Sequence, residues 1–399
     1  MSDVLQAETR ALRTLITSSV VSKAADYGLS LVAPLAVLRT TGSPATAIFV
    51  ISLRGVAYVA SPLLGSLIDR FERRLVFALS QFGQAACVAV VAIALDSEYL
   101  VALMLLVSGL GGVASSITGQ FVLIPELVAA ERRPHAVARL TSAIEFAKVG
   151  GFLIGGVTVG AFGAVGSTLL IVALYALAGL IALTLAKVPV DSAAAPTSLR
   201  QDLALGFSWL AKPDIGWLVL SMSVANLAVG GLGTVLVTVL AEHGSSATVI
   251  SVSLAVGLLA GAVGARVAPW VLVGRSLELK ILVYQAISAL ALVAIATELS
   301  SAVLIGGFAV MSFALGLSNV ASISFRQDVI PVPVAGRVNS VIRMFIAGAI
   351  PLSGFLYAGA EASHLWLWLP AVVLAAVSLL IWVIYMARFD SRQDEAYAS

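Results

Sequence analysis

The chain has 399 residues, of which 60% are hydrophobic and only 11% carry a charge. About 25% of the residues in a typical soluble domain are charged, so this composition excludes a soluble globular protein and indicates an integral membrane protein. The net charge of +2 is too small to indicate a nucleic-acid-binding protein.

The reactive residue types form no recognisable enzyme or metal site. The single cysteine, Cys87, lies in an apolar run, and the three histidines fall in predicted loops without metal-ligand spacing. No lysine follows a glycine, so the phosphate-binding loop of nucleotide hydrolases is absent. We therefore expect no enzyme activity, no metal and no cofactor, and uphill work would draw on an ion gradient or on another protein.

Apolar runs of about 20 residues, the length that crosses a bilayer as a helix, recur along the whole chain. They predict an all-α membrane protein with twelve transmembrane helices. The predicted spans are residues 14–38, 44–68, 75–95, 99–122, 138–162, 167–186, 214–240, 246–273, 277–297, 301–324, 338–360 and 365–387.

Lysines and arginines predict the orientation, because cytoplasmic loops are enriched in them. With a cytoplasmic N-terminus, 17 of the 23 lie in inside segments, five lie within spans, and only Arg39 lies in an outer loop. We therefore expect both termini in the cytoplasm.

The two halves of the chain repeat each other. Residues 139–156 align without gaps on residues 337–354, with Arg, Ser, Ile and two Gly identical at an offset of 198 residues. The duplication predicts two pseudo-symmetric six-helix bundles, residues 1–190 and 214–399. Such a repeat places the substrate path between the halves, near the bilayer midplane.

Residues 191–213 form the longest break between spans, and we predict a cytoplasmic linker. Leu199, Leu203, Phe207 and Leu210 follow helical spacing with Trp209 beside them, which is typical of a short amphipathic helix. Such a helix can lie on the membrane face, but an ordinary linker helix is the preferred interpretation.

Charged side chains inside a membrane are costly and are functional candidates by default. The spans contain five basic and two acidic residues. The spans therefore carry an excess positive charge of +3. Arg266 and Arg343 lie near the cytoplasmic ends of their spans, where long side chains reach water, and without these two the excess is +1. This excess favours an anionic or zwitterionic substrate, unless neighbouring charges simply neutralise each other as structural pairs. The predicted substrate cavity comprises Lys23, Asp26, Arg54, Tyr58, Glu145, Lys148, Asn226 and Arg343.

Asp26 and Glu145 are the predicted proton-coupling residues. A low-dielectric cavity favours a protonated carboxyl group, whereas a nearby cation favours the ionised form, so Asp26 is placed to exchange a proton against Lys23 or Arg54. The repeat sets Glu145 opposite Arg343, which suggests a salt bridge that opens and closes during transport. It also sets Asp26 opposite Asn226.

Residues 65–74 (Gly-Ser-Leu-Ile-Asp-Arg-Phe-Glu-Arg-Arg) resemble the loop between helices 2 and 3 of the major facilitator superfamily, G-x-L-x-D-R-x-G-R-R/K. Glu72 replaces the second glycine, which is typical of the branch that contains the bacterial enterobactin exporter and macrolide-efflux-like proteins. In this family the loop is a gate, whose acid caps helix 11 and whose basic residues clamp the two halves. The resemblance implies a cytoplasmic gate made of Gly65, Asp69, Arg70, Arg73 and Asn339.

The resemblance implies a monomeric secondary transporter in the cytoplasmic (inner) membrane of a bacterium. We expect it to export amphipathic molecules, such as siderophores or macrolide-like compounds, in exchange for protons by alternating access. One alternative on the same fold is an importer or facilitator of an iron chelate, nutrient or metal ion. Another is a lysophospholipid flippase, which would need an apolar lateral opening. The expected partners are a small-molecule substrate, protons and membrane lipid, without nucleic acid.

Overall fold

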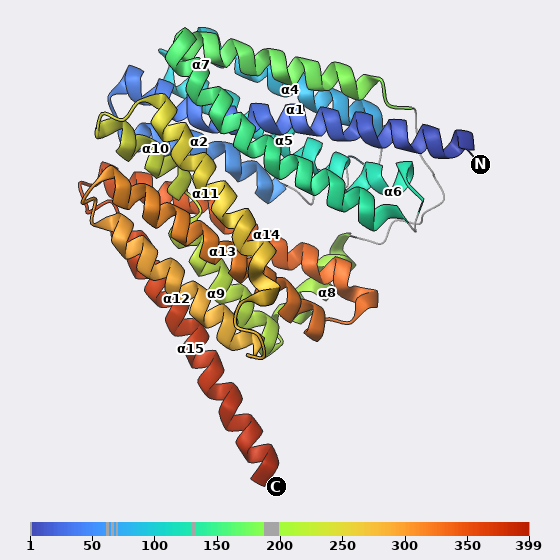
Figure 1. The fold of residues 1–399 in the computed structure, drawn as a ribbon, viewed down its shortest axis with the longest axis vertical. Coiled ribbons are helices and arrows are strands. Elements are labelled where there is room, and N and C mark those ends of the chain that lie inside the picture. Colours follow the sequence, from blue (N-terminus) through green and yellow to red (C-terminus); the bar gives the residue numbers. More distant parts are fainter. Residues whose placement is uncertain are drawn as a thin grey trace. The chain divides into compact units, whose positions relative to one another are not determined.

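The computed structural model describes residues 2–60, 64, 68, 71–129, 132–186 and 199–398. All regular elements in these residues are helices (Figure 1), and ten of the helices are long and apolar enough to cross a membrane. The predicted all-α membrane fold is thereby confirmed, whereas the count of twelve spans and the cytoplasmic termini stay predictions.

The helices follow the predicted spans closely. In chain order they are α1 (Ser2–Thr41), α2 (Pro44–Val56), η1 (Ala57–Ala60), α4 (Arg73–Ile93), α5 (Glu98–Ile117), η2 (Thr118–Val122), α6 (Leu123–Leu127), α7 (Arg133–Leu183), α8 (Leu199–Leu210), α9 (Pro213–Val229), α10 (Leu232–Glu242), α11 (Ala247–Val267), η4 (Ala268–Trp270), α12 (Leu277–Ala296), α13 (Ser301–Val329), α14 (Val332–Ala362) and α15 (Leu369–Ala398).

Two of the predicted spans are joined in a single helix. The spans at 138–162 and 167–186 lie in α7, which is interrupted by a kink at Gly163. Its backbone angles of φ 68° and ψ −172° belong to a region that glycine adopts far more readily than any residue with a Cβ. The chain therefore turns between the two spans at this glycine without a separate loop.

Turn-forming and capping residues precede the starts of several helices. Gly42 has a positive φ of 65°, Ser43 accepts a hydrogen bond from the Thr46 backbone nitrogen at 3.2 Å, and Pro44 opens α2. A serine side chain satisfies one of the free N–H groups at a helix start, and proline suits the first helical position. Ser276 and Ser300 cap α12 and α13 in the same way.

The chain divides into two compact units. The first unit comprises Met1–Pro196 and Thr234–Ala255, and the second comprises Thr197–Gly233 and Val256–Ser399. α10 and α11 therefore contribute to both units. The division into halves at residues 190 and 214 follows the duplication and stays a prediction.

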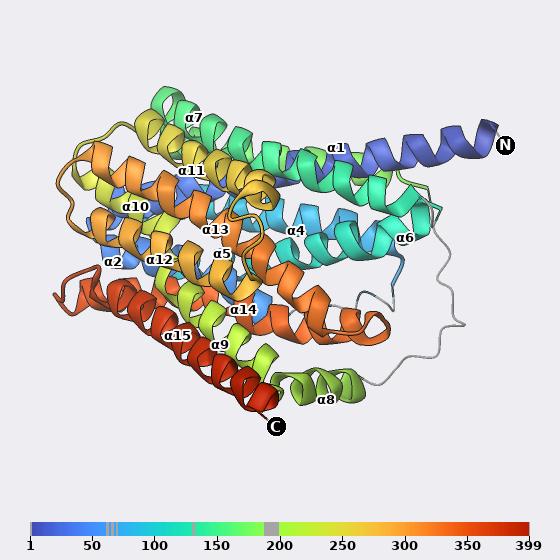
Figure 2. The same cartoon turned by 60° about the horizontal axis from the view of Figure 1, so that its bottom comes forward.

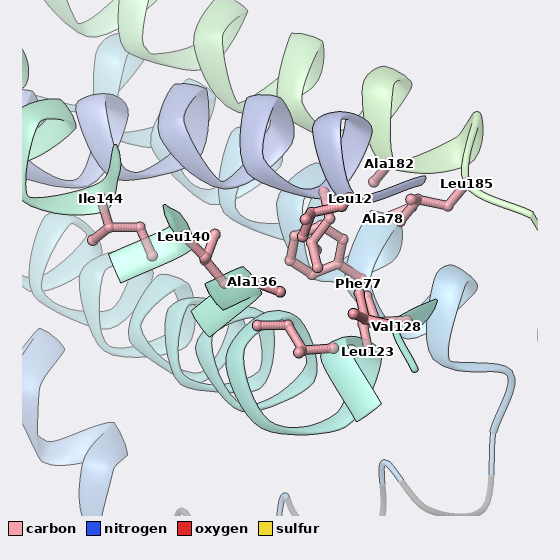
Figure 3. Close-up of a cluster of buried hydrophobic side chains, with 12 residues drawn as sticks. Leu12, Phe77, Ala78, Leu123, Val128, Ala136, Leu140, Ile144, Ala182 and Leu185 are labelled. Carbon is pink, nitrogen blue, oxygen red and sulfur yellow. The ribbon is translucent and has the colours of Figure 1, made fainter. Parts of the chain in front are cut away.

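Helices α1, α4, α5 and α7 of the first unit pack side by side (Figures 1 and 2). Figure 3 shows a hydrophobic cluster at one end of this packing, in which Phe77 of α4 lies among Leu12 of α1, Leu123 of α6 and Leu140 of α7. All four side chains are buried. The cluster anchors these helices at one end, and the charged side chains described below lie beyond it along α1.

Glycines bring α1 and α7 into backbone contact. A Cβ built on Gly151 would collide with the Ala24 carbonyl oxygen and lie 3.0 Å from the Tyr27 Cβ, and one on Gly155 would lie 3.2 Å from the Gly28 Cα. Membrane helices approach closely where small residues line their interface. These two glycines therefore have a packing role.

In the second unit, α9, α12, α13 and α15 surround a core that includes Leu218, Ile281 and Trp382. A second cluster joins α9 to α14, and Leu210 and Trp209 of α8 pack against it. The Phe207 ring of α8 also meets Phe345 of α14 edge-on, with 5.9 Å between the centroids. A helix is thus present where the linker helix was predicted, and its apolar residues contact other helices.

Gly151→Ala should lower the thermal unfolding midpoint in detergent, because the added methyl group forces α1 and α7 apart. Overpacking of this kind costs about 1–3 kcal/mol. The neighbouring Gly150 is a matched control, because nothing lies within 4 Å of its Cβ position. Gly150→Ala should leave the midpoint unchanged or raise it slightly through its higher helix propensity. An equal effect of both substitutions would refute the packing role.

Candidate functional site

The Asp26 carboxylate in the first unit accepts hydrogen bonds from three side chains. Oδ2 accepts from Lys23 Nζ at 2.7 Å, and Oδ1 accepts from Arg54 Nη2 and from the Tyr175 hydroxyl, both at 2.5 Å. Arg54 Nη2 also donates to the Tyr175 hydroxyl at 2.8 Å. The predicted residues Lys23, Asp26 and Arg54 therefore lie together, and the carboxylate links α1, α2 and α7.

Uncharged polar side chains extend this cluster to α4 and α5. Arg54 Nη2 lies 3.2 Å from the Gln84 Oε1 atom, and Gln84 Nε2 donates to Gln81 Oε1 at 3.3 Å. Gln81 Nε2 in turn donates to Ser115 Oγ at 2.5 Å, while Lys23 Nζ reaches Ser116 Oγ at 2.9 Å. The polar groups therefore form a connected network, as buried polar groups require.

Glycines of α5 make room for Arg54. A Cβ on Gly109 would collide with the Arg54 carbonyl oxygen, and a Cβ on Gly112 would lie 3.2 Å from Gln84 Oε1 and 3.6 Å from Arg54 Nη2. The first contact brings the α2 backbone against α5. The second leaves space in which the guanidinium and the glutamine amide meet.

The three charged groups of the cluster sum to one excess positive charge. Their side chains are 13% (Lys23), 14% (Arg54) and 9% (Asp26) exposed, so they are largely but not completely enclosed. Arg54 Nε is buried and makes no hydrogen bond in the described part of the chain. An anionic group that reaches Lys23 or Arg54 would therefore find a cation with donor capacity to spare.

Glu145 and Lys148 form a second ion pair in the first unit, with 2.7 Å between Oε1 and Nζ. The Lys148 Nζ also lies 5.5 Å from the centre of the Tyr27 ring, which favours a cation–π contact. Tyr58, another predicted cavity residue, is 45% exposed. Within the described residues, no group of three or more His, Cys, Asp or Glu side chains is placed to hold a metal ion.

Asn226 lies in the second unit, just before a break between α9 and α10. Its Nδ2 donates to the Ile346 carbonyl oxygen of α14 at 2.8 Å. Beyond it, the Ala228 carbonyl oxygen accepts from the Tyr357 hydroxyl at 2.8 Å, and the Gly231 backbone nitrogen donates to Ser353 Oγ at 2.9 Å. Side chains of α14 thus satisfy backbone groups that the broken helix leaves free, as a membrane interior requires.

Arg343 is exposed on α14, in a different unit from Glu145. Their proposed pairing, and the shared cavity that would contain Asp26 and Asn226, stay predictions.

The predicted gate is described only in part. Gly65, Asp69 and Arg70 lie outside the described residues. Arg73 begins α4, and its Nε lies 2.8 Å from Glu126 Oε1 of α6. Asn339 of α14 accepts a hydrogen bond from Arg326 Nη1 of α13 at 3.1 Å. Both residues therefore join neighbouring helices of their own unit.

The sequence analysis missed Tyr175, Gln84, Gln81 and Tyr357. Gln81 and Gln84 carry a detectable signal, because two amides three residues apart lie on one face of an otherwise apolar span. The two tyrosines carry none, because a tyrosine in an apolar run is as typical of core packing as of a polar contact.

The family model described as Major Facilitator Superfamily matches residues 15–354. No curated protein matches the sequence.

Several solved structures are similar in fold. The nucleoside transporter NupG has a TM-score of 0.77 at 16% identity, with 95% of this chain and 99% of that chain covered. A bacterial homologue of the iron transporter ferroportin, in an inward-facing state, has a TM-score of 0.76 at 18% identity, with 94% and 98% covered. The POT family transporter PepTSo has a TM-score of 0.75 at 11% identity, with 96% and 98% covered. At these identities the likeness concerns the fold alone.

Asp26→Asn should strongly destabilise the protein, because it leaves Lys23 and Arg54 as two enclosed cations without a carboxylate. Removing one partner of a buried ion pair costs about 3–5 kcal/mol. Tyr175→Phe removes only one hydroxyl from the same carboxylate and should cost about 1 kcal/mol. Thermal unfolding in detergent measures both. The importance of the carboxylate is refuted if Asp26→Asn destabilises the protein no more than Tyr175→Phe.

Proposed function

Because the chain belongs to the major facilitator superfamily and has the fold of a multi-pass membrane transporter, we propose that it exports amphipathic small molecules in exchange for protons. The molecules are zwitterionic or anionic, with siderophores and macrolide-like compounds as the model classes. The location is the cytoplasmic membrane of a bacterium.

The observation that carries this proposal is the network around Asp26. Two cations share one carboxylate in helices that are apolar enough to cross a membrane. Charges inside a membrane mark substrate or ion pathways, and the excess positive charge selects a substrate with an anionic group. Lys23 and Arg54 bind that group in the proposal, while Asp26 takes up the proton.

Exchange requires that substrate and proton compete. A zwitterion meets this requirement, because its anionic group binds Arg54 while its cationic group replaces Lys23 at the Asp26 carboxylate. A proton on Asp26 removes the negative charge that holds the cationic group. Substrate and proton then exclude each other at one carboxylate, which is the coupling that an antiporter needs.

If the substrate is purely anionic, the same site supports a second candidate function. A proton on Asp26 releases Lys23 and Arg54 from their partner, so proton and anion bind cooperatively and would travel in the same direction. This is the importer alternative, in which an inward proton gradient drives the uptake of an anionic nutrient or iron chelate. The similar folds of a nucleoside transporter and of an iron transporter homologue are compatible with uptake as well as with efflux.

The pH dependence of binding distinguishes these functions. A thermal-shift screen of the purified protein with siderophores, macrolides and lysophospholipids at two pH values identifies the ligand. A zwitterion that competes with the proton should bind more weakly at the lower pH, whereas a co-transported anion should bind more tightly. A stabilising lysophospholipid in place of both would support the flippase alternative.

Asp26→Asn should abolish concentrative transport, because the amide cannot exchange a proton at this position. The measurement is accumulation of the identified compound in inside-out and right-side-out vesicles with an imposed proton gradient. Accumulation in inside-out vesicles that a protonophore collapses would support export.

Two controls belong with this assay. Asp96→Asn makes the same chemical change in an exposed loop residue and should leave accumulation unchanged. A monodisperse size-exclusion profile of Asp26→Asn in detergent shows that the destabilised variant is still folded. If Asp26→Asn still concentrates the compound, Asp26 is not the coupling residue.

A further inference from the structure

The second unit contains a cavity of about 250 Å³ that no part of the proposed proton mechanism uses. It lies among α9, α12, α13, α14 and α15, next to the break that follows α9. Drug-sized ligands occupy pockets of about 300–1,000 Å³. This cavity is therefore large enough for a small molecule or for one substituent of a larger one.

The wall of this cavity is mostly apolar, and its polar groups are uncharged. Among the described residues that line it, none is Asp, Glu, Lys, Arg or His, whereas Asn226, Gln285, Ser288, Ser318, Asn319 and Ser378 contribute amides and hydroxyls. A charged group would enter without a counter-charge, which is unfavourable in a low-dielectric interior. The wall therefore selects an uncharged ligand that forms hydrogen bonds.

Part of the wall is held in place by its own hydrogen bonds. Gln285 Nε2 donates to Ser221 Oγ at 3.1 Å, and the Ser221 and Ser378 hydroxyls each donate to the other's carbonyl oxygen, at 3.1 and 3.0 Å. These bonds join α9, α12 and α15. A framework whose side chains are already fixed loses little conformational entropy when a ligand binds.

Other polar groups in the wall have no partner. Ser288 is only 7% exposed, yet its hydroxyl makes no hydrogen bond in the part of the chain that the structure describes. The same holds there for the Asn226 Oδ1 atom and for the Asn319 amide, which is exposed. Because Ser288 lines the cavity and its hydroxyl has no partner among the described residues, a ligand in the cavity can form a hydrogen bond with this hydroxyl.

The first unit shows which chemical group can occupy the position that is equivalent to this cavity. Asp26 corresponds to Asn226 at an offset of 200 residues, and Gln84 corresponds to Ser288 at 204 residues, the offset between the starts of α4 and α12. The Arg54 guanidinium, a planar group of N–H donors, contacts both Asp26 and Gln84. Beside Asn226 and Ser288 the second unit has the cavity instead. Because Asn226 is a neutral amide where Asp26 is a carboxylate, the matching occupant is a neutral donor.

We propose that this cavity binds an uncharged hydrogen-bonding group, such as an amide or a hydroxyl, whose donor meets Asn226 Oδ1 and the Ser288 hydroxyl. Assigning that group to the transported molecule rests on the proposed transport function. Binding itself does not, so it is tested without transport.

Thiol labelling tests whether the cavity admits uncharged molecules. Cys87 is the single cysteine of the chain, so Cys87→Ala provides a thiol-free background. Ser288→Cys in this background should react with the uncharged reagent N-ethylmaleimide, followed by mass spectrometry of the full-length protein. Ser322→Cys is the matched control, because Ser322 is 2% exposed, does not line the cavity, and has a hydroxyl without a hydrogen-bond partner among the described residues. It should react far more slowly.

Protection by three alanine derivatives of similar size tests the charge preference. N-acetylalanine amide is neutral, alanine amide is a cation and N-acetylalanine is an anion at neutral pH. Only the neutral compound should slow the labelling of Ser288→Cys. The rate should fall about twofold when its concentration equals the dissociation constant and about tenfold at ten times that concentration.

A second substitution separates binding from access. Asn226→Ala, combined with Ser288→Cys, removes the proposed acceptor and should weaken the binding of N-acetylalanine amide by about two- to tenfold, the loss expected for one hydrogen bond. Labelling of Ser288→Cys no faster than that of Ser322→Cys would overturn the proposal. So would equal protection by all three compounds, or no protection by any of them. If protection is as expected but vesicles transport nothing, the cavity assignment stands and the transport function fails.

Discussion

The arrangement of the first unit depends on one enclosed carboxylate. Asp26 binds donors from α1, α2 and α7, and Arg54 carries the network on to Gln84 of α4. Burying these charges is unfavourable unless each of them is paired and hydrogen-bonded. The helices are therefore restricted to positions at which these groups can reach Asp26, and the glycines of α5 allow that approach. In the proposed function, the same pairs that stabilise the unit are also the groups that a substrate or a proton would displace.

The sequence predicts which residues matter better than it predicts their partners. Lys23, Asp26 and Arg54 are conspicuous because they are charges in apolar runs, and pairs three residues apart on a helix, such as Lys23 with Asp26, follow from spacing alone. The partners of Arg54 do not follow, because they come from α1, α4 and α7, and their proximity depends on how the helices pack. Tyr175 is uncharged and gives no local signal.

The break between α9 and α10 is another feature that depends on helix packing and does not follow from the local sequence. The apolar run at 214–240 predicts one span, yet the structure divides it into α9 and α10. Glycines are common in membrane helices, so Gly230 and Gly231 alone do not indicate a break. The break is stable because Tyr357 and Ser353 of α14 satisfy the free backbone groups. Those two residues lie more than 100 positions away in the sequence, and only the packing brings them to the break.

The duplicated positions Asp26 and Asn226 have diverged, so that the first unit has an ionic site and the second has an uncharged one. In the first unit the carboxylate is already satisfied by Lys23 and Arg54, so an ionic ligand gains only the difference between its own contacts and those that it replaces. The proposed binding there would be an exchange of partners, which would keep affinity moderate and tie it to protonation. In the second unit Asn226 and Ser288 have unused hydrogen-bonding capacity. A ligand that lacks the matching donor leaves these groups unpaired, which is the situation in which a polar site rejects analogues most strongly. A carrier must release what it binds, and in the proposed mechanism the exchangeable ionic site would govern coupling and release while the uncharged cavity would govern which molecule is accepted.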